Sequence, residues 1–202
     1  IALLLTTIEI FTFDINYYDK KFEQYEIEEE TGLEKSELLE IIQDMLDYLK
    51  DKRDSISSKE VFGQREVLHM EDVKVLFDKG FKIRNITLAL SILSILFLII
   101  RDKAELGKAL IILSSLYLSL MLILASLMYI DFDKYFDYFH MIFFNNDLWL
   151  LDPEKDILIQ MLPLDFFYSI AYKISSLFIV QLILILFLGI YINRSYKNPY
   201  LR

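Results

Sequence analysis

The chain contains two histidines, His69 and His140, and no cysteine. Imidazole titrates near neutral pH, so it is the group that most often moves protons in catalysis. Each histidine lies just outside a hydrophobic segment, and the topology argued below places both on the same side of a membrane. The pair therefore predicts proton-transfer catalysis on a lipid-linked substrate, without any thiol chemistry.

Charged residues accompany His69 on a stretch with helical spacing. Asp72 follows His69 by three residues, so the two share a helix face, and the carboxylate could hold the ring in one tautomer. A surface His–Asp pair on an amphipathic helix is equally ordinary. Arg65 could meet a carbonyl or phosphate group of a substrate, or simply pair with Glu66.

His140 lies among phenylalanines and is followed by polar residues. Aromatic belts form at the headgroup level of most membrane proteins, so this enrichment alone needs no catalytic explanation. An imidazole among phenyl rings near lipid is nevertheless partly desolvated, which favours its neutral, base-competent form. Asn146, Trp149 and Asp152 supply hydrogen-bonding groups shortly afterwards.

The elements that position these residues are membrane helices. The chain has 202 residues, of which 55% are hydrophobic, and its mean hydropathy is +0.38. Three continuous apolar runs, at 83–100, 109–130 and 170–192, are each long enough to cross a hydrocarbon core of about 30 Å as a helix. They lack the period-two alternation of barrel strands, so the predicted fold class is all-α.

A fourth apolar segment opens the chain at residues 1–13. We interpret it as the outer part of a span whose beginning is missing, which gives a four-helix transmembrane bundle. Thirteen residues are too few to cross a bilayer, so a signal-peptide remnant or an interfacial helix remains an alternative.

Charge placement predicts the orientation. Basic residues occur in the short connection 101–108 and in the tail that ends at Arg202, so both are expected to be cytoplasmic. The acidic regions 14–82 and 131–169 are then extracytoplasmic, and both are expected to be mainly helical and to cap the bundle of a single membrane domain, 1–202. The net charge of -9 argues against a nucleic-acid partner.

Two outer helices are predicted within 14–82. One starts at Ser36 as an N-cap candidate and carries an apolar stripe that either packs on the protein, the commoner use, or lies on the membrane. The stripe consists of Leu39, Ile42, Met45, Leu46 and Leu49. The other spans 65–80, with Gly80 as its C-cap candidate just before the next span.

The histidines and their surroundings together resemble the lipoprotein intramolecular transacylase family. The resemblance covers nearly the whole chain and rests on the order and spacing of four short motifs. These are His69-Met70-x-Asp72-Val73, then Phe139-His140-x-x-Phe143-Phe144-x-Asn146-x-x-Trp149, then Asp152-Pro153, and last Leu162-Pro163-x-x-Phe166-Phe167.

The resemblance implies a multi-pass enzyme of the cell membrane of Gram-positive type bacteria, with its active site on the extracytoplasmic face. It would move the sn-2 acyl chain of a diacylglyceryl-cysteine lipoprotein onto the amine of the same cysteine, giving an N-acyl lyso form. The family's two catalytic histidines correspond to His69 and His140. The implied partners are this lipoprotein and membrane lipid, with no cofactor and no metal; the sequence indicates no oligomeric state.

The residues themselves give a reason for such chemistry. The substrate amine is the nucleophile, so no enzyme nucleophile is needed, but a base must collect its proton. We assign His140 as the base and His69, oriented by Asp72, as the electrophile or acid; the reverse also fits. A second imidazole, or the N–H groups of asparagine and tryptophan, could stabilise the oxyanion.

Two other functions compete with this one. A metal-dependent membrane hydrolase could use both histidines with an acid such as Asp72, Asp133 or Asp137, although no HExxH-like spacing supports it. A non-enzymatic membrane sensor or partner-binding subunit could instead use the histidines to respond to pH.

Overall fold

The computed structural model describes residues 1–57 and 60–197, and the predicted cytoplasmic position of Arg202 lies outside them. The regular structure in the described residues is α-helical, in agreement with the predicted class. The helices are α1 (Ala2–Thr12), α2 (Ile15–Gln24), α3 (Ile27–Thr31), α4 (Lys35–Leu49), α5 (Gln64–Arg101), α6 (Lys103–Ile130), α7 (Phe132–Phe143), α8 (Ile157–Met161) and α9 (Leu164–Lys197).

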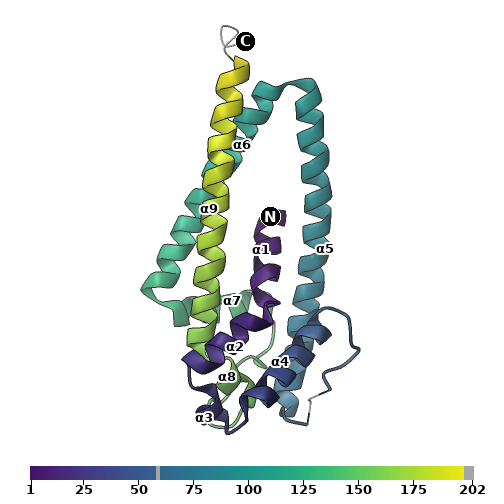
Figure 1. The fold of residues 1–202 in the computed structure, drawn as a ribbon, viewed down its shortest axis with the longest axis vertical. Helices are drawn as coiled ribbons and strands as arrows, with labels where there is room; N and C mark the ends of the chain where they lie inside the picture. The colour runs from purple at the N-terminus through teal and green to yellow at the C-terminus, as the bar shows by residue number, and fades with distance from the viewer. Residues whose placement is uncertain (58–59, 198–202) are drawn as a thin grey trace. The chain divides into compact units, whose positions relative to one another are not determined.

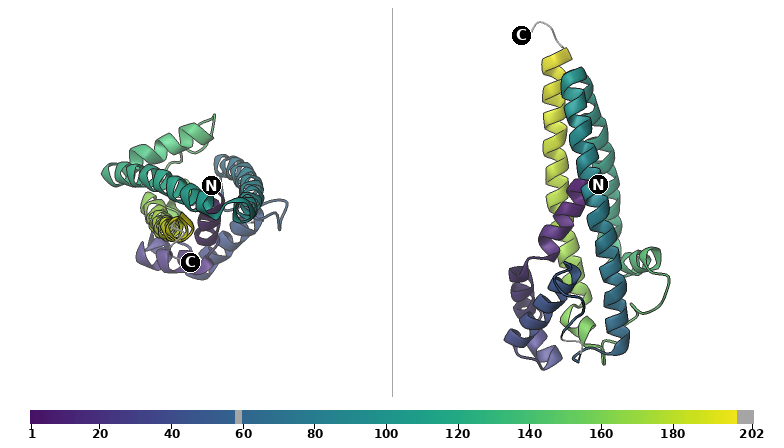
Figure 2. Two further views of the ribbon diagram at one scale, coloured as in Figure 1. Left: turned by 90° about the horizontal axis from the view of Figure 1, so that it is seen from above. Right: turned by 90° about the vertical axis from the view of Figure 1, so that its right-hand side faces the viewer.

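Three of these helices are long and apolar enough to cross a membrane. They are the long ribbons of Figures 1 and 2, with candidate spans at Gln64–Arg101, Lys103–Ile130 and Leu164–Tyr196. The three complete spans predicted from the apolar runs are therefore confirmed as helices of sufficient length. α1 is apolar but shorter, so the fourth span remains a prediction.

The prediction that a helix ends at Gly80 is wrong. α5 runs through this residue without interruption and joins the 65–80 segment to the following apolar run. A glycine inside a helix costs about 1 kcal/mol relative to alanine, and neither a proline nor a left-handed residue is present here to end the helix. His69 thus lies on the same continuous helix as a membrane span.

The described residues gather in two compact units, each built from separate parts of the chain. Unit 1 contains 1–7, 82–131 and 172–202, and unit 2 contains 8–81 and 132–171. Both histidines, and every polar residue that the sequence associates with them, belong to unit 2.

Close helix packing holds unit 1 together. Met121, Phe178 and Leu182 form a buried apolar cluster. The hydroxyl oxygen of Thr7, which is fully buried, lies 3.1 Å from the side-chain oxygen of Gln181 on α9. Near the other end of α9, a Cβ atom at Gly107 would lie 2.6 Å from the backbone nitrogen of Asn193, so only glycine fits there.

Unit 2 has a core of its own in which α4 buries its apolar face. Ile42, Met45, Leu46 and Leu49 of the predicted stripe are at most 6% exposed, which favours the interpretation that the stripe packs on the protein. α2 and the start of α9 add aromatic rings; the centroids of Tyr18 and Phe166, for example, are 5.0 Å apart.

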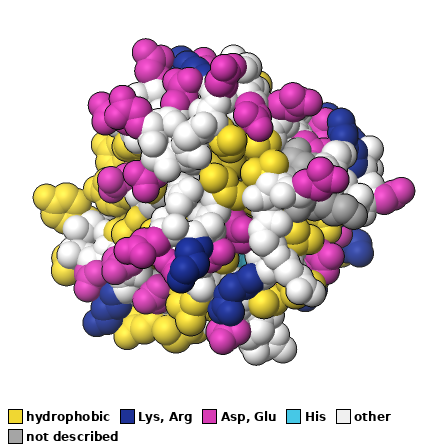
Figure 3. All heavy atoms as spheres, turned by 90° about the horizontal axis from the view of Figure 1, so that it is seen from below, with side chains coloured by type: hydrophobic (Ala, Val, Ile, Leu, Met, Phe, Trp, Pro, Cys, Tyr) yellow, Lys and Arg dark blue, Asp and Glu magenta, His cyan; other side chains and the backbone are white. Residues whose placement is uncertain are grey.

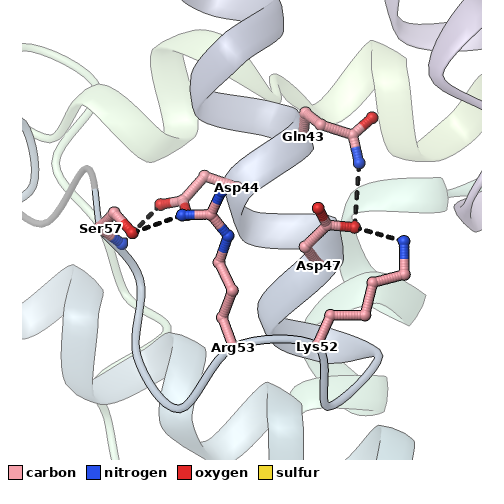
Figure 4. A network of polar contacts seen from close by, with 6 residues as sticks. All are labelled: Gln43, Asp44, Asp47, Lys52, Arg53 and Ser57. Atoms are coloured by element: carbon pink, nitrogen blue, oxygen red, sulfur yellow. Dashed lines mark hydrogen bonds and ion pairs between the residues drawn. The ribbon is translucent and has the colours of Figure 1, made fainter.

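Acidic residues of α4 fasten the loop that leads into α5. The buried carboxylate of Asp44 lies 3.0 Å from Nη1 of Arg53 and accepts a hydrogen bond from the backbone N–H of Ser57 at 2.6 Å. Asp47 accepts from Lys52 at 2.7 Å (Figure 4). The polypeptide is therefore held in place just before the helix that carries His69.

Candidate active site

The structure brings the two histidines together. His69 on α5 and His140 on α7 are 71 positions apart in the chain, yet their ring centroids are separated by 6.1 Å. Both side chains are largely buried, with 8% and 7% of their surface exposed. The two imidazoles that the sequence analysis pairs are therefore close enough to act on one substrate.

Aromatic rings enclose His140 on several sides. The indole of Trp149 stacks on the imidazole with a centroid distance of 4.7 Å and an angle of 18°. Phe136 and Phe139 present their rings nearly perpendicular to it, at 4.5 and 5.4 Å. The orientation of the imidazole is therefore fixed by packing.

A backbone contact also selects the tautomer of His140. Its Nδ1 atom lies 2.8 Å from the carbonyl oxygen of Phe136, one turn earlier in α7. Because a carbonyl oxygen can only accept, Nδ1 carries the hydrogen in this contact. The lone pair of the neutral ring is then on Nε2, which is the atom available to take up a proton.

His69 is packed against the same cluster but keeps an unused polar atom. Its ring meets that of Phe144 edge-on with a centroid distance of 5.4 Å. Its Nδ1 atom is buried and has no hydrogen-bond partner. Buried polar atoms are rarely left without a partner in folded proteins, so this nitrogen is a candidate for contact with a bound substrate.

Burial keeps both rings neutral at physiological pH. Removal from water lowers the pKa of His69 to about 4, with a further decrease from the neighbouring His140 and a smaller increase from Asp72. Burial also lowers the pKa of His140, against the contact with the Phe136 carbonyl and the charge of Asp137. One neutral imidazole can thus accept a proton while the other donates a hydrogen bond.

The predicted pairing of Asp72 with His69 is replaced by a different contact. Oδ2 of Asp72 accepts a hydrogen bond from Nδ2 of Asn146 at 2.8 Å, whereas Nδ1 of His69 stays unpaired. Helical spacing places Asp72 and His69 on one side of α5. The donor that binds the Asp72 carboxylate, however, is the side-chain amide of Asn146, which lies in the segment after α7. Asp72 acts on His69 only through its charge.

Arg65 holds the same segment one residue further on. Its guanidinium donates a hydrogen bond to the backbone oxygen of Asp147, and Nη2 lies 3.5 Å from the carboxylate of that residue. Arg65 and Asp72 lie about one turn before and after His69 on α5. Together they attach residues 146–147 to the helix on both sides of the histidine.

This attachment places the stacking partner of His140. Nε1 of Trp149 donates a hydrogen bond to the backbone oxygen of Asn146 at 2.9 Å. The indole N–H is therefore already used, and so is one N–H of the Asn146 amide. These groups fix the indole against the imidazole, and the indole N–H is not free to stabilise an oxyanion as the sequence suggested.

Asp152 belongs to a separate turn. Its carboxylate accepts a hydrogen bond from the backbone of Glu154 at 3.0 Å and binds the ammonium group of Lys155 at 2.5 Å. Its own backbone N–H donates to Asp156 at 2.6 Å. The structure thus gives Asp152 the role of shaping the chain before α8.

Glu66, which the sequence analysis named only as a possible partner of Arg65, instead holds two backbone segments. Its side chain is 2% exposed, and its two oxygens accept backbone hydrogen bonds from Gly63 at 2.6 Å and Leu158 at 2.7 Å. Burial raises the pKa of this carboxyl above its ordinary value. An acidic residue in the first turn of a helix indicates from sequence where that helix begins. The contact of Glu66 with Leu158 could not be predicted in this way, because the two residues are 92 positions apart.

The metal site of the competing hydrolase hypothesis is not formed in the described part of the chain. Within 1–57 and 60–197, no three His, Asp or Glu side chains come close enough together to hold a metal ion. Asp72, the acid that the sequence analysis places on the same helix face as His69, is bonded to Asn146 instead.

Little of either histidine reaches the protein surface. Figure 3 shows one face of the molecule, on which acidic, basic and apolar side chains alternate and only a small area of histidine is visible in a recess. This agrees with the low exposure of both rings.

The comparisons with known proteins point to one family. A family model described as lipoprotein intramolecular transacylase Lit matches residues 1–167. The chain is also similar to a solved structure of the membrane-integral lipoprotein intramolecular transacylase Lit from Bacillus cereus, with a TM-score of 0.88 and 23% identity over 97% of this chain and 91% of that one.

Two further structures of the Bacillus cereus protein, in which one histidine is replaced by arginine or by alanine, are similar with TM-scores of 0.76 and 0.77. Each is 23% identical over 97% of this chain, and the matches cover 89% and 90% of those chains. No match was found among curated proteins.

Proposed function

Because the chain belongs to the lipoprotein intramolecular transacylase family, it is a membrane acyltransferase that acts on lipoproteins, and we propose that His69 and His140 carry out its reaction. The observation that supports this assignment is the 6.1 Å separation of two buried rings that come from different helices. Proton transfer between a substrate and two enzyme groups needs that proximity.

In the proposed reaction, the α-amine of the lipoprotein's N-terminal cysteine attacks the sn-2 ester carbonyl of its own diacylglyceryl group. A C–N bond forms, the C–O bond to the glyceryl oxygen breaks, and one proton moves from nitrogen to that oxygen. The products are an amide and a free glyceryl hydroxyl, so no external reactant is consumed. Both reacting groups belong to one molecule, and the enzyme's main task is to bring them together.

His140 is the base in this proposal. Its Nδ1–H is bonded to the Phe136 carbonyl, which leaves Nε2 to take the proton of the attacking amine. Aromatic packing holds the ring in that orientation, with Trp149 stacked on one face. A preoriented base contributes about 10²–10⁴-fold to the rate of such a step.

His69 is the electrophile. A pKa of about 4 keeps its ring neutral at pH 7, so it stabilises the developing oxyanion by donating an N–H hydrogen bond, rather than as a cation. The unpartnered Nδ1 atom is one of the two ring nitrogens that could make this contact. The proton that His140 has collected then passes to the departing glyceryl oxygen, so both rings end the reaction in their neutral forms.

Arg65, Asp72, Asn146 and Trp149 support the pair by position. The first two fasten the segment that contains Asn146, and that residue accepts the indole hydrogen bond of Trp149. Asp152 shapes the following turn. No cofactor or metal ion takes part in the proposed reaction, and its partners are the diacylglyceryl lipoprotein and the surrounding lipid.

We further propose a four-span topology with the active site on the extracytoplasmic face of a bacterial cell membrane. The basic residues of the 101–108 connection and the acidic character of 14–82 and 131–169 support this orientation. In it, residues 1–13 belong to the first span.

Mass spectrometry of lipoprotein N-terminal peptides tests the function directly. Cells that express the chain are expected to contain the N-acyl lyso form, and cells without it the diacylglyceryl form with a free amine. If both cells contain only the diacylglyceryl form, the transacylase function is rejected.

The same assay tests the histidines. Replacement of His69 or His140 by alanine is expected to lower the acyl-transfer rate at least about 100-fold, with the purified variants still folded in detergent. Glu37→Ala, an exposed position on α4, is the matched control and should retain full activity. Near-normal activity of either histidine variant would remove that residue from the mechanism.

A further inference from the structure

The helix that carries His140 has an apolar face that the described protein leaves uncovered. Tyr135, Tyr138, Phe139 and Ile142 follow the spacing of a single face of α7. Three of them are highly exposed: Tyr138 is 45%, Phe139 40% and Ile142 75% accessible. We refer to these four residues as the α7 apolar face.

The other sides of α7 are different in character. Asp133 and Asp137, one turn apart, lie away from the α7 apolar face, and His140 is the only residue of the helix that is buried. α4 shows the opposite arrangement, because its apolar residues are buried inside unit 2. α7 therefore exposes the kind of surface that a folded domain normally covers.

Chain connectivity indicates what covers it. α6, a candidate membrane span, ends at Ile130, and α7 begins at Phe132, so one residue separates them. One residue covers less than about 4 Å, so the start of α7 lies at the depth where the span leaves the lipid. Tyr129 and Ile130, the last two residues of α6, are apolar and highly exposed, at 81% and 77%.

We propose that α7 lies in the lipid–water interface of the bilayer, with the α7 apolar face inserted at the boundary between headgroups and acyl chains. Exposed aromatic and aliphatic side chains on one side and acids on another are the pattern of a helix that lies in the plane of a membrane. Tyrosine is also favoured at that depth because its ring is apolar and its hydroxyl polar.

Apolar contact, not charge, drives this insertion. α7 carries Asp133 and Asp137 but one cation, Lys134, so it has no excess of positive charge to attract anionic headgroups. The depth of α7 is therefore expected to be the same in zwitterionic and anionic bilayers, and at low and high salt.

This insertion would determine how deep His140 lies relative to the lipid bilayer. His140 lies on the same 12-residue helix as the α7 apolar face. Inserting that face therefore holds the imidazole within a helix diameter, about 10 Å, of the acyl-chain boundary. A glyceryl ester lies at this level in a bilayer. The interfacial helix would thus set the height of the proton acceptor relative to the ester it serves.

Depth-dependent fluorescence quenching tests the proposal independently of catalysis. Trp149 is the only tryptophan, so a Trp149→Phe background allows a single probe to be introduced. Ile142→Trp places it on the α7 apolar face, and Met141→Trp, the next residue and also exposed at 60%, is the matched control on another side.

In proteoliposomes with bromines near the carbonyl end of the acyl chains, the Ile142→Trp probe should be quenched at least about threefold more than the Met141→Trp probe. Aqueous iodide should show the reverse order. Equal quenching of the two probes by bromolipid overturns the proposal. Protection of the Ile142→Trp probe from both quenchers overturns it as well, because another protein segment or a second copy would then cover the face.

An activity measurement adds a second arm in the wild-type background. Ile142 and Met141 are both highly exposed, at 75% and 60%, whereas the two histidines are buried. Ile142→Glu should reduce acyl transfer on a vesicle-embedded lipoprotein at least about tenfold, while Met141→Glu should stay within twofold of wild type. Equal activity of the two glutamate variants would contradict the role of the α7 apolar face in setting depth.

Discussion

Burial determines what His69 can do. A ring that is 8% exposed and next to a second imidazole is held in its neutral form, with a pKa of about 4. An imidazole with such a low pKa is a weaker base than an ordinary histidine. Its N–H group can nevertheless donate a hydrogen bond over a wide range of pH. This is why the electrophile's role fits His69 better than the base's.

The pH dependence of kcat/KM follows from these protonation states. An α-amine has an ordinary pKa of about 7.7–8.0, and only its free form attacks. The pKa of His69 is lowered, so this ring stays neutral as the pH falls from 8 to about 5 and removes no further activity there. Burial also lowers the pKa of His140, the proposed base, below its ordinary value of 6.5. We therefore expect kcat/KM to fall about tenfold per pH unit as the pH decreases from 7 to 6.5, a slope of one that steepens only below pH 6.5, where His140 begins to be protonated.

A stopped assay of purified enzyme in buffers of constant ionic strength measures this slope. A slope of two that begins near pH 6.5 would mean that a histidine with an ordinary pKa must be deprotonated, against the protonation states assigned here. His69→Ala provides the background rate at each pH.

At this scale the sequence predicted the pair of histidines but not all their neighbours. Two isolated imidazoles beside apolar segments were enough to suggest a common site. The contact of Asp72 with Asn146 depends on how the chain after α7 returns to α5, and the contact of Glu66 with Leu158 spans 92 positions. The spacing of neighbouring residues in the sequence contains no information about either of these long-range contacts.

At the scale of elements, two glycines in long helices have opposite roles. Gly80 lies inside α5, and a Cβ atom there would meet nothing within 4 Å. A Cβ atom at Gly107 of α6 would instead lie within 2.6 Å of the α9 backbone. The first glycine is replaceable, whereas the second lets two helices approach closely.

Alanine substitutions should therefore change stability in opposite directions. Gly80→Ala is expected to stabilise by about 0.5–1 kcal/mol, because alanine loses less backbone entropy in a helix. Gly107→Ala is expected to destabilise by about 1–3 kcal/mol, because the helices must move apart. Thermal unfolding of the two variants in the same detergent, beside wild type, measures both. A lower melting temperature for Gly80→Ala would indicate that α5 needs its glycine.

The sequence predicted where helices occur better than where they end. The apolar runs identified the spans, and the spacing of Ile42, Met45 and Leu49 identified the buried face of α4. The stop predicted at Gly80 was wrong because glycine is also tolerated inside a helix whose neighbouring residues favour it. A helix end is decided by a few tenths of a kcal/mol to about 1 kcal/mol, which a single residue does not settle.

At the scale of the whole molecule, the all-α class followed directly from the continuous apolar runs. Lipid offers no hydrogen bonds, so the backbone of such runs must be helical. The grouping of residues 8–81 with 132–171 in one compact unit was not predictable from composition. It depends on contacts between segments that are far apart in the chain, such as α5 with α7.

The proposed orientation can be tested with single thiols, since the natural chain has no cysteine. Ser36→Cys in 14–82 and Lys155→Cys in 131–169 should react with a membrane-impermeant maleimide in intact cells. Lys103→Cys in the 101–108 connection should react only after permeabilisation. The wild-type chain is the unlabelled control, and labelling of Lys103→Cys in intact cells would reverse the topology.

Because Trp149 stacks on His140, the fluorescence of this tryptophan should report the protonation state of the histidine. The chain's only indole lies 4.7 Å from the ring of the proposed base, and a protonated imidazole at that range accepts electron density from an excited indole. Ultraviolet emission from the unlabelled protein therefore follows the ionisation of one particular side chain.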